Sequence, residues 1–189
     1  RETEAYLTDV VACMGAAKWI NHPEANRTAS NKLTQLRLAQ SLGMRVPRTV
    51  VTNDPQSAAD FAASVGPAGM IYKTLTYPFI EETADMFRSV YTSIVRLTPE
   101  VLGAIEAAPC LFQERIEKDY ELRVTVVGQN IFAVRIYSQE QEATSLDWRR
   151  DQHATTLRQE VTTLEPMVHA FCLEITKRLG LIFGALDFI

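Results

Sequence analysis

Three strand-like segments follow one another in the middle of the chain, and they constrain the fold more than any other feature. Residues 110–116, 121–127 and 131–138 are rich in apolar side chains, many of them β-branched or aromatic, and a Gly-Gln-Asn turn that begins at Gly128 separates the last two. Apolar and polar residues alternate along 121–127, which is typical of a sheet with one buried face. The pattern predicts an antiparallel sheet built from consecutive strands.

Helix signals lie on both sides of this sheet. Apolar spacing, capping residues and glycine stops predict helices at about 6–17, 31–42, 54–65, from 98 onward and at 164–179, with short strands at 46–52, 69–75, 86–95 and after Gly180. The polar stretch 21–31 is predicted to be a connection, and the charged stretch 139–152 a loop that interrupts the sheet. The predicted fold class is therefore α+β.

Composition excludes several classes of protein. The 189 residues, of 21.2 kDa, are 47% hydrophobic and 22% charged, which are values of a globular chain rather than a disordered or fibrous one. The net charge of −4 provides no electrostatic footprint for nucleic acid. No apolar run approaches the ~20 residues that cross a bilayer. Three cysteines in apolar surroundings favour a cytoplasmic setting without a disulfide framework.

The two ends of the sequence are unusual for a complete domain. The chain begins with Arg1 and ends at Ile189, inside the apolar run 181–189. Natural termini more often lie at the surface among polar residues. We therefore expect a chain that is truncated at both ends.

Charged residues inside apolar strands are the first candidates for chemistry, because the usual short motifs for phosphate, dinucleotide and nucleophile sites are absent. Lys73 follows Met-Ile-Tyr and is either a lysine that extends to solvent or an ammonium directed at phosphate. Asp187 is the single charge in 181–189, so we expect it to be buried with a cation as partner. A divalent metal is the leading candidate for that cation, and a salt bridge is the alternative.

Polar groups at the ends of two central strands form a second set of candidates. The segment from Gln113 to Ile116 ends one strand, where extended backbone offers a carbonyl and an amide to a planar base such as adenine. Glu121 begins the next strand, and its carboxylate could accept two hydrogen bonds from a ribose diol. The alternative is a solvated charged turn. Arg149 belongs either to a surface loop or to a site where a guanidinium meets phosphate oxygens, and Lys32, at a helix start, is equally open.

The order of these motifs along the chain is more specific than any one of them. They are Asn31-Lys32 opening a helix, Lys73 in a strand, Phe-Gln-Glu-Arg-Ile at 112–116, Glu-Leu-Arg at 121–123, Val-Val-Gly at 126–128, Asp-Trp-Arg at 147–149 and Gly-Ala-Leu-Asp-Phe at 184–188. This set, which covers nearly the whole chain, resembles the ATP-grasp ligases of the RimK and glutathione synthetase type. Within them it is most similar to the ATP-grasp maturases of ribosomal peptides, the microviridin and graspetide ligases, to which the stretches 19–23, 51–55 and 147–149 point.

The resemblance implies a fold, a domain division and roles for individual residues. The implied fold is ATP-grasp, with a nucleotide between two α/β lobes: 1–30 would end a preceding region, 31–112 would form the smaller lobe, and 113–189 would form an incomplete second lobe. The implied roles are phosphate binding by Lys32 and Lys73, adenine binding by the hinge with Gln113, Glu114 and Ile116, ribose binding by Glu121, a contact with the terminal phosphate and acyl phosphate by Arg149, and magnesium binding by Asp187.

The resemblance also implies ATP and Mg²⁺ as cofactors and a reaction. ATP would phosphorylate Asp or Glu side chains of a ribosomal precursor peptide, and an alcohol or amine would attack the acyl phosphate to close an ester or amide macrocycle. The precursor would bind through its leader and its core, and the intact enzyme would be a homodimer. The alternatives are a RimK-like ligase that adds an amino acid to a small molecule or protein tail, and a degenerate module that binds nucleotide or leader peptide without turnover.

Two departures from the family pattern qualify these implications. Segment 74–82 contains no glycine, whereas many ATP-grasp enzymes close a glycine-rich loop over the phosphates there. The family also follows its first magnesium ligand with Glu and Asn on the next strand, whereas this chain ends two residues after Asp187. We therefore expect the fragment alone to be inactive in ligation.

Overall fold

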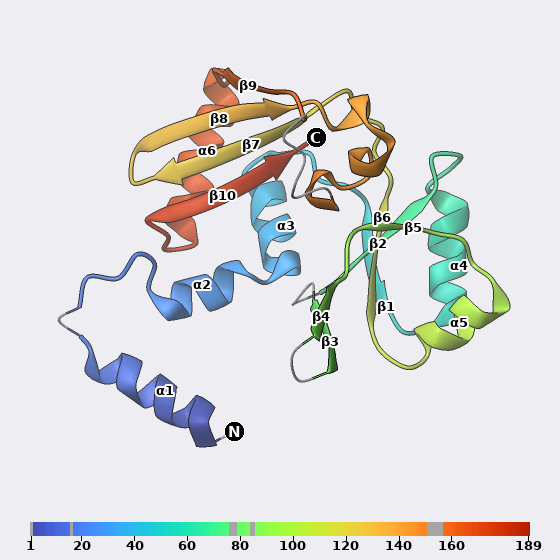
Figure 1. Cartoon of the computed structure of the whole chain (residues 1–189), viewed down its shortest axis with the longest axis horizontal. Helices are drawn as coiled ribbons and strands as arrows, with labels where there is room; N and C mark the ends of the chain where they lie inside the picture. The colour runs from blue at the N-terminus through green and yellow to red at the C-terminus, as the bar shows by residue number, and fades with distance from the viewer. Residues whose placement is uncertain (1, 16, 76–78, 84–85, 151–156) are drawn as a thin grey trace.

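Two antiparallel sheets of four strands each form the frame of the molecule and lie side by side (Figure 1). One sheet has the strand order β1-β6-β2-β5 and the other β10-β7-β8-β9, while β3 and β4 form a separate hairpin. The computed structural model describes residues 2–15, 17–75, 79–83, 86–150 and 157–189. Helices cover these sheets, so the predicted α+β class is confirmed.

The elements have the following bounds. The strands are β1 Thr49–Thr52, β2 Met70–Lys73, β3 Phe79–Thr83, β4 Met86–Ser89, β5 Ser93–Val95, β6 Cys110–Glu114, β7 Glu121–Val127, β8 Asn130–Ile136, β9 Gln159–Thr162 and β10 Phe183–Phe188. The helices are α1 Glu2–Cys13, α2 Pro23–Ala29, α3 Lys32–Ser41, α4 Pro55–Ser64, α5 Pro99–Ile105 and α6 Pro166–Arg178, with short 3₁₀ turns η1 Ser138–Glu140, η2 Glu142–Thr144 and η3 Trp148–Arg150.

The first lobe consists of the β1-β6-β2-β5 sheet with α4 and α5 packed on one face. Met70 of β2 and Phe112 of β6 are each 2% exposed and belong to the core beneath these helices. Because side chains alternate along a strand, Tyr72 also packs on this core whereas Lys73 lies on the opposite face. The local sequence of β2 therefore directs Lys73 away from the helices.

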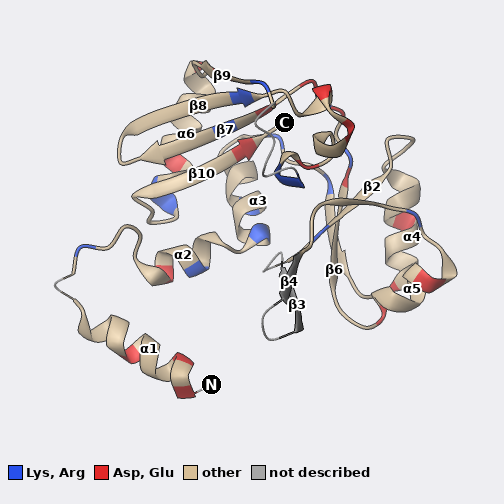
Figure 2. Cartoon of the chain, viewed as in Figure 1, with Lys and Arg blue, Asp and Glu red and all other residues tan. Residues whose placement is uncertain are grey.

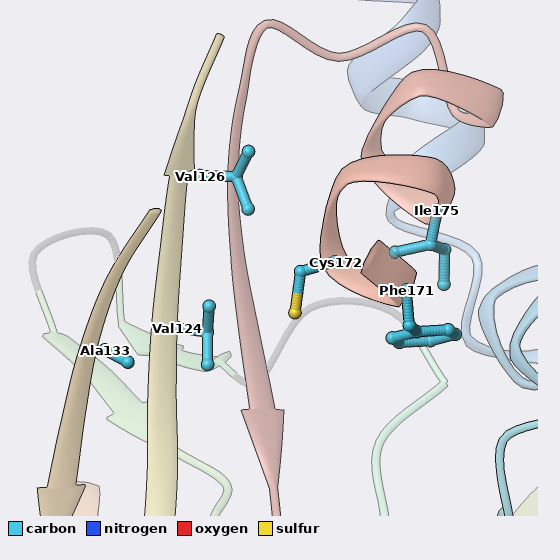
Figure 3. Packing of buried hydrophobic residues seen from close by; sticks show 6 residues of the cluster. All are labelled: Val124, Val126, Ala133, Phe171, Cys172 and Ile175. Atoms are coloured by element: carbon cyan, nitrogen blue, oxygen red, sulfur yellow. The ribbon is translucent and has the colours of Figure 1, made fainter. Parts of the chain in front are cut away.

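The second lobe consists of the β10-β7-β8-β9 sheet with α6 across one face (Figure 3). Val124 and Val126 of β7 and Cys172 of α6 have no exposed surface, and Figure 3 shows their side chains between the sheet and the helix. This packing confirms the half-buried alternation predicted for 121–127. Leu38 and Ala39 of α3 contact the same core, so α3 is held against the second lobe.

The N-terminal third differs from the prediction in two ways. The predicted connection 21–31 is wrong, because it contains helix α2, which starts at Pro23 and is capped by His22. The predicted amphipathic helix at the N-terminus exists as α1, yet none of its residues is buried and Tyr6 is 66% exposed. In Figure 1, α1 extends away from both sheets. The apolar spacing therefore predicted the helix correctly, but it did not predict that the apolar residues of α1 are left exposed.

Several short elements were not predicted. Hairpin β3-β4 and edge strand β9 were missed, the expected strand at 86–95 is divided into β4 and β5, and the loop at 139–152 contains short 3₁₀ turns. Edge strands and two-stranded hairpins carry little apolar periodicity, which explains these misses. Residues 76–78 of the glycine-free segment lie outside the described residues. The three cysteines are free, and within the described ranges no helix has the length and apolar character needed to cross a membrane.

The start of α3 provides a first testable prediction. The sequence allows Ser30 or Asn31 as the cap; the N-cap is Asn31, whose side-chain oxygen accepts a hydrogen bond from Thr34 N–H at 3.0 Å. We expect Asn31→Ala to lower the free energy of unfolding by about 1 kcal/mol, because an N–H of the first turn loses its partner. Urea unfolding measures the change. The matched control Gln40→Ala alters an exposed position on the same helix, and an equal loss in both variants would contradict the capping role.

Candidate functional site

A cleft of about 1220 Å³ lies between the two lobes. The first lobe contributes the outer face of β2 and the end of β6, and the second lobe contributes β7, β10 and the η3 turn. All of the residues that the sequence singled out line this one cleft: Lys32, Lys73, Gln113, Glu114, Ile116, Glu121, Arg149 and Asp187. Segments that are more than 150 residues apart in the chain, such as the start of α3 and the end of β10, therefore meet at one site.

Among the basic side chains that line this cleft, those of Lys32, Lys73, Lys118 and Arg149 interact electrostatically. Lys73 extends from the end of β2, and Lys32 from the start of α3, where Figure 2 shows basic residues. Burial lowers the pKa of Lys73, and the charge of Arg149 lowers it further, with smaller contributions from Lys118 and Lys32. Burial and Arg149 also lower the pKa of Lys32. Mutual repulsion in a partly desolvated space makes this region suited to a polyanion.

Arg149 is held by a buried carboxylate. Its Nε and Nη2 atoms donate to the two oxygens of Asp147, each at 2.8 Å, and the Asp147 side chain is 3% exposed. Burial alone would raise the pKa of Asp147, but the hydrogen bonds and charge of Arg149 lower it to about 2. The bidentate pair fixes the plane of the guanidinium, and the Arg149 side chain as a whole is 50% exposed.

Glu121 pairs with a lysine that the sequence analysis did not single out. Lys118 Nζ lies 2.9 Å from Glu121 Oε1, and the two side chains are 11% and 10% exposed. Lys118 also donates to the carbonyl of Leu146 at 3.4 Å. Its place three residues before Glu121, in the turn between two strands, is the one signal that could have identified it. The carboxylate of Glu121 is thus placed in the cleft by a nearly buried ion pair.

The end of β6 forms a narrow backbone hinge. Glu114 N–H donates to the carbonyl of Arg48 at 3.0 Å, and its side chain accepts from Arg48 N–H at 3.0 Å. Gln113 Nε2 donates to Thr49 Oγ1 at 2.9 Å. In the described part of the chain, no hydrogen bond involves the backbone of Ile116. The hinge is anchored through Gln113 and Glu114, and the Ile116 amide and carbonyl are available to a ligand.

Asp187 departs from the prediction. The expectation that it would be buried is wrong, because its side chain is 42% exposed. The structure shows the alternative, a salt bridge, because Arg123 Nη1 donates to both carboxylate oxygens of Asp187 at 2.8 and 2.9 Å. The Arg123 guanidinium lies 5.9 Å from the ring centroid of Trp148. Cross-strand pairing of β10 with β7 places Asp187 opposite Arg123, a register that the sequence did not indicate.

The donor set for a metal ion is correspondingly small. Among the described residues there is no group of three His, Cys, Asp or Glu side chains that could hold one. Mg²⁺ bound through one or two carboxylates together with substrate phosphates needs fewer protein ligands. Asp187 lines the cleft and would fit that second mode as one carboxylate, in exchange for its bonds to Arg123.

Comparison with solved structures identifies the architecture. A RiPP-associated ATP-grasp ligase of Chryseobacterium gregarium, solved with ADP and a leader and core peptide, is 32% identical with a TM-score of 0.81, over 90% of this chain and 50% of that one. Macrocyclase MdnB of Microcystis aeruginosa is 30% identical with a TM-score of 0.76, over 100% of this chain and 56% of that one. The chain has the ATP-grasp fold of the ribosomal-peptide ligases. It spans about half the length of these relatives.

A more distant likeness agrees on the fold alone. The D-alanine–D-alanine ligase of Bacillus anthracis, complexed with ATP, is 14% identical with a TM-score of 0.56, over 86% of this chain and 51% of that one. No protein-family model matches the chain. No curated protein matches it either. The structural relatives confirm the predicted ATP-grasp fold and the predicted resemblance to the peptide maturases, while the roles of individual residues stay predictions.

Proposed function

We propose that this chain is the nucleotide-binding part of an ATP-dependent ligase that acts on a ribosomal precursor peptide. ATP would phosphorylate a peptide Asp or Glu carboxylate, and a Ser or Thr hydroxyl or a Lys amine would displace phosphate from the acyl phosphate to form an ester or amide. The observation that carries the proposal is the cleft, where basic side chains face an open backbone hinge. The solved relatives with a leader and core peptide support the choice of substrate.

The proposed nucleotide orientation follows from the positions of the basic cluster and the hinge. Adenine would lie against the end of β6, where the backbone of Ile116 supplies one donor and one acceptor. The phosphates would lie between Lys73 and Lys32, whose pKa values are lowered first by burial and then by the charge of Arg149, a repulsion that a polyanion would relieve. Glu121 lines the same cleft, where it is paired with Lys118. It would accept the ribose hydroxyls in exchange for that lysine.

The proposed chemistry requires charge neutralisation more than a protein nucleophile. The free face of the Arg149 guanidinium would contact the terminal phosphate and the acyl phosphate, where negative charge accumulates during transfer. Mg²⁺, when bound, would neutralise phosphate charge, and Asp187 would hold it as one carboxylate ligand. The cytoplasmic setting and the homodimer of the intact enzyme belong to the same proposal.

Calorimetric titration with ATP, with and without Mg²⁺, tests this function, and Glu121→Gln tests the ribose assignment. We expect the wild-type chain to bind ATP more tightly than 2′,3′-dideoxy-ATP, and Glu121→Gln to lose about tenfold in ATP affinity because a charged acceptor is removed. The variant should bind the two nucleotides alike. The matched control Glu106→Gln removes an exposed carboxylate beyond α5 and should leave both affinities unchanged.

Three outcomes would change the proposal, one of its residue roles or the choice of function. Absence of ATP binding by the wild-type chain would contradict the proposal. A Glu121→Gln variant that still discriminates against the dideoxy nucleotide would remove Glu121 from the ribose site. Nucleotide binding, combined with a longer form of the protein that turns over no precursor peptide, would identify the alternative binding module.

A further inference from the structure

The loop that contains η3 in the second lobe binds Thr92 of the first lobe through hydrogen bonds. Thr92 precedes β5 and is 8% exposed, and its N–H donates to Asp147 Oδ2 at 3.3 Å. Its carbonyl accepts from Arg150 Nη2 at 2.9 Å. The Arg150 guanidinium also lies 5.9 Å from the ring centroid of Tyr91. Both backbone groups of Thr92 are therefore bound by the loop that contains η3, which fastens the two lobes together.

The carboxylate that makes this contact is the one that holds Arg149. Oδ1 of Asp147 accepts from the backbone N–H of Arg149 at 3.2 Å and from its Nε at 2.8 Å, while Oδ2 accepts from Nη2 at 2.8 Å and from Thr92. A carboxylate offers about four acceptor positions, so this set saturates it. Asp147 cannot turn to another partner without giving up either Arg149 or the first lobe.

A simple surface ion pair would not have this form. Exposed pairs are weakly held, with both groups in solvent. Here the Asp147 side chain is 3% exposed while the Arg149 side chain is 50% exposed and lines the cleft, and within the described residues no acceptor binds Arg149 Nη1. The buried end of the pair is fixed by the lobe contact, and Arg149 lies close enough to Lys73 in the cleft for its charge to lower the pKa of that lysine.

We propose that Asp147 is a positioning residue that couples the contact between the lobes to the orientation of Arg149. When the loop is fastened to Thr92, the bidentate bond holds the guanidinium in one plane at the cleft. When the lobes separate, the same carboxylate loses a partner and Arg149 loses its fixed orientation. The link to nucleotide rests on the proposed function, whereas the coupling of Thr92, Asp147 and Arg149 does not.

The coupling is tested on the nucleotide-free chain by NMR of arginine side chains. The Nε–H of Arg149, assigned through Arg149→Lys, should exchange slowly with solvent in the wild type and faster in Asp147→Asn, because an amide has a single acceptor oxygen and cannot hold the guanidinium in a bidentate pair. Glu174→Gln is the matched control, since it removes the carboxylate from the exposed pair with Arg178 on α6 and should leave the Arg149 signal unchanged. Persistence of slow exchange in Asp147→Asn would overturn the proposal.

Arg150→Gln tests whether the lobe contact matters. This variant leaves Asp147 and Arg149 in place but removes the bond to the Thr92 carbonyl. Faster exchange of the Arg149 Nε–H is expected, and an unchanged rate would overturn the coupling. Arg150→Gln also carries the test if Asp147→Asn does not fold.

Nucleotide affinities give the second readout. Asp147→Asn should lose about tenfold in ATP affinity with little change for ADP, since a misplaced Arg149 loses a charge-assisted contact to the last phosphate. Arg149→Lys should show the same loss, and the double variant should lose no more, as expected for residues that act as a unit. Tighter ATP binding by Asp147→Asn would mean that its charge only repels phosphate, which would overturn the proposal. If the wild type binds neither nucleotide, the proposed function fails and the NMR result alone decides the coupling.

Discussion

Lys73→Ala is expected to weaken ATP binding about 10-fold to 150-fold, which corresponds to the ~1.5–3 kcal/mol of a hydrogen bond to a charged group. Lys73 stands on the cleft face of β2, and among the described residues the charges that shift its pKa are those of three cations and Asp147. A phosphate would be its natural partner. Titration with ATP measures the loss, and Lys177→Ala, at an exposed position on α6, is the matched control.

The same substitution should not destabilise the nucleotide-free chain. Burial and nearby cations lower the pKa of Lys73 below its ordinary value of 10.5, so the unfolded chain binds the proton more tightly. The resulting penalty is fully present below the lowered pKa and disappears as the pH rises past 10.5. Lys73→Ala should therefore match or exceed the wild type in thermal stability at pH 7, and the difference should shrink between pH 7 and 10.

Two results would contradict this account. Unchanged ATP affinity in Lys73→Ala would reject the phosphate role. A lower melting temperature at pH 7 would mean that the lysine stem stabilises β2 by packing, and that its charge carries little penalty. The combination of weaker binding and equal or higher stability is characteristic of a group that is kept for a ligand.

Local signals in the sequence predicted much of the fold, and they also singled out residues that line the cleft. Asn31, Asp54 and Thr98 start their helices as predicted, because a cap depends on contacts within three residues. The strand 121–127 was predicted from alternation, which depends only on which side chains face a core, and the strand predicted at 110–116 is present as Cys110–Glu114. The family resemblance supplied the order of the site residues, and the fold brought them to one cleft.

Partners across the fold could not be predicted in this way. The pairing of Asp187 with Arg123 depends on the register of β10 against β7, which no local pattern encodes. The contacts of Asp147 with Thr92 join segments 55 residues apart. Lys118 was missed for a related reason, since a lysine in a turn is ordinary until the fold nearly buries it against Glu121. Sequence thus singled out residues that line the cleft, while the tertiary structure determined what each one touches.

Phe112→Ala is expected to have the largest effect on stability, a loss of about 3–5 kcal/mol in the free energy of unfolding. Phe112 is 2% exposed in β6, which pairs with both β1 and β2, and it packs in the core with Ala58, Met70 and Ile105. Truncation removes its contacts and leaves a cavity that the surrounding strands cannot close. Urea unfolding measures the loss, and Phe132→Ala, at a 60% exposed position in β8, should cost only about 0.5 kcal/mol.

The position of Phe112 also ties this loss to the site. Gln113 and the rest of the hinge follow Phe112 directly in the chain. A cavity at Phe112 would therefore loosen the hydrogen bond of Gln113 to Thr49, which holds the segment that would receive adenine. We therefore expect Phe112→Ala to bind ATP more weakly than the wild type even at a temperature where it remains folded, with Phe132→Ala unaffected. A folded Phe112→Ala chain with wild-type ATP affinity would show that the hinge keeps its geometry without support from the first-lobe core.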